Sequence, residues 1–241
     1  MDTTHLQAIT RLRQLVPVSL RHAQTLLDQC TGNAERAAER FKSELLQLLV
    51  AKSGLPPTEA QPYLERAHYD IPQALSAIED ARFTLTERIL RKNPQDNSRA
   101  IGLIADAIEH VENLQRQYWL SFDDIERLAP PLRCFMTLYE WTLHEEWEGF
   151  DSALCFHLPQ AIAQLRYLQM SELADALEHA DQRQRHLRNS HAGTATSTEM
   201  AELINQDEAI TACGEAYARQ RHVLDAALVN LAQTTIETFP R

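Results

Sequence analysis

Apolar residues recur along most of the chain at intervals of three and four, the spacing that places them on one face of an α-helix. Turn-forming residues separate these segments, and prolines stand mostly at their apparent boundaries. Only 6 glycines occur in 241 residues, which disfavours an architecture of strands and tight turns. We therefore predict an all-α protein with two small three-helix repeats followed by a larger helical domain.

The repeats are visible when the sequence is shifted by 37 positions, which places residues 20–41 on residues 57–78. Asn33 and Asp70 then fall together where a helix N-cap is expected, because their side-chain oxygens can accept hydrogen bonds from the first amides of a helix. The other matched pairs are small or apolar: Ala23 with Ala60, Leu27 with Leu64, Cys30 with Ala67, Ala37 with Ala74, Ala38 with Leu75, and Phe41 with Ile78.

This order of a helix, a polar turn with Asn or Asp, and a second helix resembles the ubiquitin-associated (UBA-like) three-helix fold, twice over residues 5–85. The loop with which many such domains grip ubiquitin would fall at residues 16–18 and 54–56, and neither segment has the Met-Gly-Phe sequence. The resemblance instead implies a protein-docking module of the kind found in translation factors and chaperones. The alternative is that these helices only pack into one small bundle.

The segment from Lys92 to Arg99 combines turn formers with no apolar residue and is predicted to be a linker. It divides the chain into residues 1–91 and residues 100–241. A helix is expected from Ala100 to about Trp119. Further along, Gly149 and Phe150 are predicted to form a turn that orients the two central helices, with the glycine supplying a positive φ angle and the phenylalanine packing on the core.

Charge is distributed unevenly between these two parts. Residues 1–99 carry 13 Lys and Arg against 12 Asp and Glu, a charge of +1, whereas residues 100–241 carry 10 against 22, a charge of −12, so the net charge of −11 comes entirely from the second part. Such a field repels nucleic acid and attracts basic surfaces. The carboxylates predicted to form a binding surface are Asp106, Glu109, Glu112, Asp123, Asp124, Glu145, Glu146 and Glu148. The alternative is a solvated face that only aids solubility.

A second resemblance covers residues 100–240. Its elements are Leu-Ala-Pro-Pro at residues 128–131, an aromatic-rich helix ending in acidic residues, Gly149-Phe150, Leu-Pro-Gln-Ala at 158–161 and Ser-Glu-Leu-Ala-Asp-Ala-Leu at 171–177. This order resembles the acidic DNA-mimic protein family, a bacterial helical domain. The resemblance implies a binding protein whose acidic side chains are spaced like phosphates and occupy the basic groove of a DNA-binding partner.

Signals for chemistry are weak. His144-Glu145-Glu146 lacks the second histidine of a zinc-protease helix, and neighbouring carboxylates such as Asp123 and Asp124 point to different sides of a helix. No phosphate-binding glycine loop or serine-nucleophile motif occurs. We therefore expect neither an enzyme nor a cofactor or metal site. Without an apolar run long enough to span a bilayer or a signal peptide, and with four scattered cysteines, a soluble cytoplasmic protein with reduced thiols is expected.

The sequence therefore predicts a non-enzymatic regulator that binds a basic protein through its acidic domain. The alternative is an adaptor that docks a partner through the N-terminal repeats. No direct contact with nucleic acid or membrane is expected, and a homodimer remains open.

Overall fold

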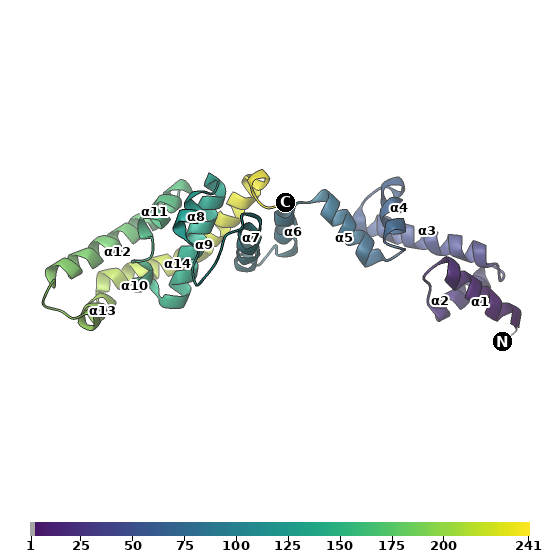
Figure 1. Ribbon diagram of the computed structural model, residues 1–241, viewed down its shortest axis with the longest axis horizontal. Helices are drawn as coiled ribbons and strands as arrows, with labels where there is room; N and C mark the ends of the chain where they lie inside the picture. The colour runs from purple at the N-terminus through teal and green to yellow at the C-terminus, as the bar shows by residue number, and fades with distance from the viewer. Residues whose placement is uncertain (1–2) are drawn as a thin grey trace. The chain divides into compact units, whose positions relative to one another are not determined.

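The computed structural model describes residues 3–241, and secondary structure in these residues consists of fourteen α-helices and one short 3₁₀ helix (Figure 1). The prediction of an all-α protein is confirmed. The chain divides into two compact units, which we call the first unit, ending at Phe83, and the second unit, Thr84–Arg241.

The first unit contains five helices: α1 (Thr3–Leu15), α2 (Leu20–Gln29), α3 (Ala34–Ser53), α4 (Pro57–Arg66) and α5 (Ile71–Arg82). Helices α2 and α4 begin 37 residues apart, and so do α3 and α5. The side chain of Asn33 accepts a hydrogen bond from the Arg36 amide at 2.8 Å, and Asp70 accepts one from the Gln73 amide at 2.9 Å. Both residues thus cap a helix as the sequence predicts.

The turns before these caps also match. The Gly32 amide donates to the Leu27 carbonyl at 2.8 Å, and the Tyr69 amide, 37 positions later, donates to the Leu64 carbonyl at 2.9 Å. Gly32 and Tyr69 have φ angles of 78° and 66°, so the second turn holds a tyrosine in a conformation that normally favours glycine. The shared register therefore extends from side-chain type to backbone geometry.

Helix α3 belongs to both halves of the first unit. Phe41 near its start packs in one apolar cluster with α1 and α2, and Leu49 near its end packs in another with α4 and α5. Leu12 of α1 lies 37 positions before Leu49, and both residues are 0% exposed. The end of α3 thus does for the second half what α1 does for the first, and five helices replace the six of two separate three-helix units.

The second unit contains the remaining helices: α6 (Leu85–Lys92), α7 (Asn97–Val111), α8 (Phe122–Glu126), α9 (Pro130–Glu148), α10 (Phe150–Ala153), α11 (Leu158–Tyr167), α12 (Ser171–Ser190), α13 (Ser197–Asn205), α14 (Glu208–Thr234) and the 3₁₀ helix η1 (Ile236–Thr238). The division falls eight residues before the predicted end of the first domain at residue 91. The reason is α6, whose buried Thr86 donates from its hydroxyl to the Pro240 carbonyl at 3.0 Å. Lys92–Arg99 accordingly joins two helices of the second unit.

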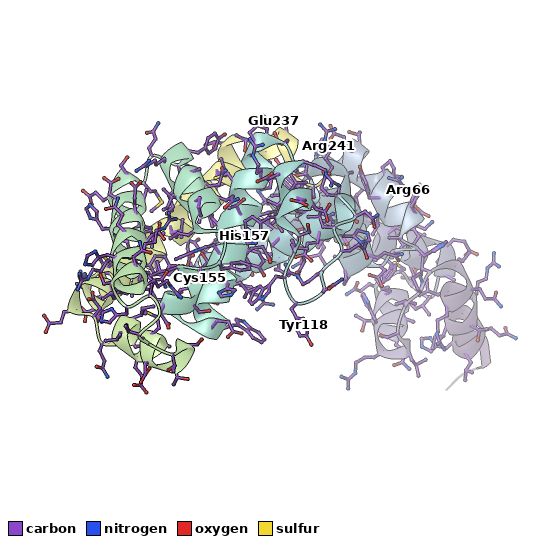
Figure 2. All side chains as sticks on the ribbon, turned by 60° about the vertical axis from the view of Figure 1, so that its left-hand side comes forward. Arg66, Tyr118, Cys155, His157, Glu237 and Arg241 are labelled. Atoms are coloured by element: carbon purple, nitrogen blue, oxygen red, sulfur yellow. The ribbon has the colours of Figure 1, made fainter. Side chains whose placement is uncertain are left out.

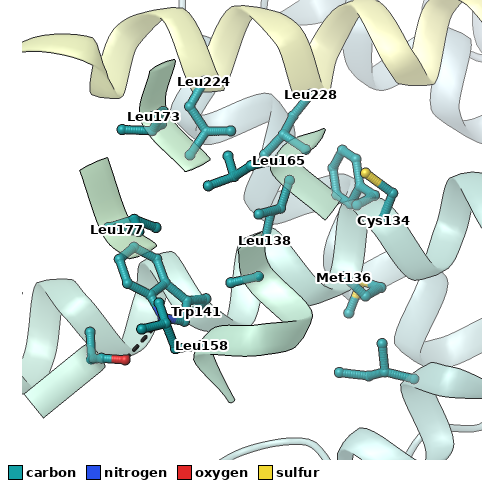
Figure 3. Packing of buried hydrophobic residues seen from close by; sticks show 14 of the residues in the cluster. Cys134, Met136, Leu138, Trp141, Leu158, Leu165, Leu173, Leu177, Leu224 and Leu228 are labelled. Atoms are coloured by element: carbon teal, nitrogen blue, oxygen red, sulfur yellow. Dashed lines mark hydrogen bonds between the residues drawn. The ribbon is translucent and has the colours of Figure 1, made fainter. Parts of the chain in front are cut away.

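Helix α9 is the centre of the second unit, because its buried residues point to almost every side and it contacts α7, α8, α10, α11 and α14. Trp141 is 1% exposed and donates from its indole nitrogen to the Ala153 carbonyl at 3.0 Å. Leu158 of α11 and Leu177 of α12 lie beside it, and Leu224 and Leu228 of α14 lie near Leu165 in the same core (Figure 3). Helix α12 runs beside the long α14 and completes the core (Figure 1).

Helix α7 ends at Val111, so the prediction of a helix reaching about Trp119 is wrong. Asn113 adopts a φ of 52°, and the Leu114 amide bonds back to the Glu109 carbonyl at 2.9 Å, which closes the helix. Residues 112–121 are consequently a loop. In the part of the chain that the structure describes, no helix combines the length and apolar character needed to cross a bilayer.

Candidate functional site

Two of the acidic residues in the second unit belong to its framework. Arg116, in the loop after α7, donates to Glu109 of α7 at 3.1 Å from Nε and to Glu140 of α9 at 3.3 Å from Nη1. The side chain of Glu140 is 0% exposed and also accepts the Leu120 amide at 3.0 Å. Glu140 therefore fixes both ends of the segment from Arg116 to Leu120.

Arg116 offsets part of the negative charge of Glu109 and Glu140 as well as donating hydrogen bonds to them. Burial acts to lower the pKa of Arg116, but Glu109 and Glu140 together raise it above its ordinary value, so the guanidinium stays charged. The two carboxylates share this one cation, so removing Arg116 would leave both of them without a partner in a mostly buried place. Glu109, predicted as part of a binding surface, is thus a structural residue.

Glu145 and Glu146, also predicted for that surface, lie next to Arg221 of α14. The Arg221 Nη2 atom is 2.8 Å from the Glu146 carboxylate, Nη1 is 3.8 Å from that of Glu145, and Nε is 3.2 Å from Asp225. Burial raises the pKa of Glu145 against the opposing effect of Arg221. These carboxylates connect α9 to α14, and their charge is partly neutralised.

The other five predicted carboxylates differ in exposure and pairing. Asp124 is 3.0 Å from Arg127, an exposed pair that contributes little stability. Asp106, Glu112, Asp123 and Glu148 are exposed and form no ion pair within residues 3–241. The eight residues therefore do not form one continuous surface of equivalent charges.

Asp123 and Glu148 lie near a group of rings that we call the aromatic–histidine cluster: Trp119, Phe122, His144, Phe156 and His157. The His144 ring stacks on Phe156 with centroids 4.0 Å apart, and the His157 ring stacks on Phe122 at 3.7 Å. Trp119 lies 4.9 Å from His144 and 5.4 Å from Phe156. Residues from the loop, α8, α9 and the segment before α11 thus meet at one place.

Both histidines in the cluster have lowered pKa values. Burial lowers the pKa of His144 below its ordinary value of 6.5, although Glu148 acts to raise it. Burial also lowers the pKa of His157, against the effects of Glu126 and Asp123. These interactions show that three exposed carboxylates, two of them predicted, surround the same cluster.

The histidines have different roles in the backbone and the packing. His144 is 8% exposed, and its Nδ1 atom is buried without a hydrogen-bond partner among the described residues. His157 precedes α11 with a φ of 48°, in the left-handed region that histidine tolerates better than most residues.

Two exposed aromatic side chains stand beside the cluster. Tyr118, next to Trp119, is 90% exposed and projects from its loop into solvent (Figure 2). Trp147 is 77% exposed and follows His144 by three residues on α9, which places both on the same side of that helix. Each exposed ring thus lies within three residues of a member of the cluster along the chain.

The Gly149-Phe150 turn lies directly after α9. Gly149 has a φ of 88°, and the half-buried Phe150 packs against Tyr217 with ring centroids 5.9 Å apart. A Cβ atom at Gly214 of α14 would lie 3.1 Å from the Phe150 ring, so the glycine leaves room for it. The turn connects α9 to α10 and, through α10, to α11.

In residues 3–241 no group of three or more His, Cys, Asp and Glu side chains is placed to hold a metal ion. The four cysteines are free: Cys134 is buried, Cys155 is exposed, and Cys30 and Cys213 are half-buried. Burial raises the pKa of Cys134 to about 12, which leaves it in the unreactive thiol form.

The sequence interpretation did not select Glu126, Tyr118, Trp147 or the two stacked histidines. One signal was available, since Trp147 stands among glutamates on a helix whose apolar residues account for the core without it. The position of Tyr118 and the contacts of Trp119 depend on the loop of residues 112–121, where a long helix was expected. The two histidine stacks join residues that are 12 and 35 positions apart in the sequence.

Comparison with known proteins identifies the family. Residues 84–237 match the family described as the YfbN C-terminal domain, and this match begins at the first residue of the second unit. The chain is also 34% identical over 239 residues to the uncharacterised protein YfbN of Escherichia coli (strain K12), covering 98% of this chain and 95% of that protein. No solved structure matches the chain. From these two matches, the chain belongs to the YfbN family of bacterial proteins.

Proposed function

We propose that the second unit is a non-enzymatic binding domain that recognises a basic protein and regulates it as an acidic mimic of DNA. The observation that carries this proposal is the position of Asp123, Glu126 and Glu148, which are exposed around one cluster and free of ion pairs within the described chain. The second unit as a whole carries 14 Lys and Arg against 24 Asp and Glu, a net charge of −10.

Such a surface attracts a basic protein over a distance set by salt. The Debye length is about 10 Å at 0.1 M and about 3 Å at 1 M ionic strength, so encounter with a positive partner slows as salt is added. A partner that uses its positive groove for DNA would then bind either DNA or this unit.

The test uses the full chain as bait in a bacterial lysate. A variant with Asp123, Glu126 and Glu148 replaced by lysine is compared with a control in which Glu202, Glu215 and Glu237 are replaced. These control residues are exposed and lie on α13, α14 and η1. A protein captured by the wild type and the control, but lost with the first variant or at high salt, is then mixed with labelled DNA and this chain.

Release of the DNA as this chain is added is the expected result. Equal capture by both variants would contradict the use of these carboxylates. Capture without DNA competition would leave a binding domain that is not a DNA mimic.

A second candidate is an adaptor that acts through the first unit, and a groove of about 530 Å³ between α4 and α5 favours it. Tyr63 and Arg66 line this groove, with the guanidinium carbon 4.7 Å from the tyrosine ring centroid. In this case Arg66→Glu would abolish capture of the partner, whereas the lysine variant of the second unit would bind normally.

A further inference from the structure

We propose that Tyr118, Trp147 and the aromatic–histidine cluster form a binding surface for arginine side chains in a basic segment of the partner. This inference rests on the proposed function, because it specifies which part of a basic protein the second unit contacts and by which chemistry. It adds a requirement for aromatic rings to the requirement for charge.

The first argument is the exposure of two large rings. Tyr118 and Trp147 are 90% and 77% exposed, whereas Trp141 on the same helix as Trp147 is 1% exposed. Neither exposed ring appears in the core of the second unit, so packing in this chain does not account for them. Tyrosine and tryptophan are enriched at the centres of protein interfaces, where they supply much of the binding energy.

The second argument is that the backbone that carries these rings is held in place. Arg116 and Leu120 both bond to the buried Glu140, so the loop that carries Tyr118 is fixed on either side of it. Trp147 is carried by the last turn of α9, which the Gly149 amide closes with a bond to the Glu145 carbonyl at 2.9 Å. Such preorganisation lowers the entropy lost on binding.

The third argument concerns charge complementarity. Glu148 follows Trp147 directly, and Asp123 and Glu126 lie near His157. The two histidines do not offset this charge at neutral pH, because burial lowers their pKa values. Exposed rings next to carboxylates suit a guanidinium group, which stacks on aromatic faces and pairs with carboxylates through its planar fork. The same carboxylates repel the phosphates of nucleic acid.

Charge also decides against a second copy of this chain as the occupant. The second unit carries a net charge of −10, so two copies meeting at this surface would bring like charges together. The arginines of another protein can stack on the rings and form ion pairs with the carboxylates.

The experiment measures binding of dye-labelled oligoarginine and oligolysine of equal length to the full chain by fluorescence anisotropy. The double variant Tyr118→Ala/Trp147→Ala is compared with Tyr167→Ala, which removes a 50% exposed tyrosine from α11. We expect oligoarginine to bind more tightly than oligolysine. The double variant should weaken oligoarginine binding by roughly tenfold, as two cation–π contacts would require, while Tyr167→Ala leaves it unchanged.

Equal affinity of the double variant and the wild type for oligoarginine would overturn the inference. Including the variant in which Asp123, Glu126 and Glu148 become lysine separates this failure from that of the proposed function. If that variant loses binding and the aromatic variant does not, charge alone recognises the peptide. If neither substitution matters, both proposals fail. Sedimentation equilibrium supplies a second test, because a dimer that Trp147→Ala dissociates would assign the surface to self-association instead.

Discussion

Glu140 and Glu148 lie on the same helix, eight residues or about two turns apart, yet their surroundings differ completely. The Glu140 side chain is 0% exposed and bonded to Arg116 and Leu120, whereas Glu148 is exposed at the helix end beside Trp147. In the net charge of the unit, both residues count equally as one negative charge. The comparison shows that part of the charge of this unit maintains the fold and only the remainder is available to a partner.

The two regions are nevertheless connected. Through Arg116 and Leu120, Glu140 holds the loop that carries Tyr118 and Trp119, and Trp119 packs on His144 one turn before Glu148. The buried Glu140 thus positions Trp119 against His144, the histidine on which the exposed Glu148 also acts.

The largest effect is expected from Glu140→Ala. It leaves Arg116 with one carboxylate and the Leu120 amide without its acceptor, so the free energy of unfolding should fall by about 3 kcal/mol or more. All three tryptophans lie in the second unit, so denaturation followed by their fluorescence reports on that unit alone. Glu109→Ala, which leaves Glu140 in place, should cost less. A change below about 1 kcal/mol for Glu140→Ala would remove the distinction between the two regions.

The next prediction compares two aromatic residues on either side of the turn at Gly149, Trp147 of α9 and Phe150 of α10. Phe150 is half-buried against Gly214 and Tyr217, so Phe150→Ala should lower the free energy of unfolding by about 2 kcal/mol, less than for a fully buried ring. Trp147→Ala should change it by less than about 0.5 kcal/mol, because the ring is 77% exposed. Denaturation curves of both variants measure the difference. A large loss for Trp147→Ala would make Trp147 a packing residue and weaken the case for a binding surface.

Local features of the first unit could be predicted from the sequence, but a helix shared between its halves could not. In the first unit, a repeat of 37 positions fixes helix starts and N-caps, because each cap depends on a side chain only three residues from the amide that it binds. The sharing of α3 was not apparent, since nothing local distinguishes one long helix from the end of one repeat and the beginning of the next. Leu12 and Leu49 carry that information over 37 positions.

In the second unit, the presence of helices could be predicted from the sequence, but the burial and ion pairing of each carboxylate could not. Glu109 looks like a surface residue of an amphipathic helix until Arg116 reaches back to it from a loop. That loop exists because Asn113 ends α7 in a left-handed conformation. The spacing of the surrounding apolar residues does not predict this helix end. Burial and pairing depend on contacts between distant segments, such as Glu140 with Leu120.

A smaller effect is expected from pH, through the histidines beside Glu148. The unfolded chain binds protons at these residues below about pH 6.5, whereas the folded state keeps them neutral to a lower pH because burial lowers their pKa values. The unfolded state then binds more protons, so stability should fall as the pH drops from about 7.5 to 5.5. Melting temperatures followed by tryptophan fluorescence measure this slope.

The control for the pH effect is His144→Phe combined with His157→Asn, since asparagine also tolerates the left-handed conformation at residue 157. The slope should flatten in this variant. The raised pKa of Glu145 acts with the opposite sign above its ordinary value of 4.5, but it is present in both proteins and cancels in the comparison. An unchanged slope would show that the two histidines do not differ between the folded and unfolded states.

A small effect on stability is also expected from replacing Asp123, Glu126 and Glu148 by lysine, although the same change should abolish partner binding. The three substitutions have opposing effects on the stability of the helices. Asp123 lies in the first turn of α8, where a lysine is unfavourable, while Glu126 and Glu148 end α8 and α9, where a lysine is favourable. Three reversals also reduce the net charge of −11 and with it the self-repulsion of the fold. The free energy of unfolding should therefore change by less than about 1 kcal/mol. A loss as large as that of Glu140→Ala would mean that these carboxylates are also part of the framework, and the exposed group would no longer be distinct from the buried one.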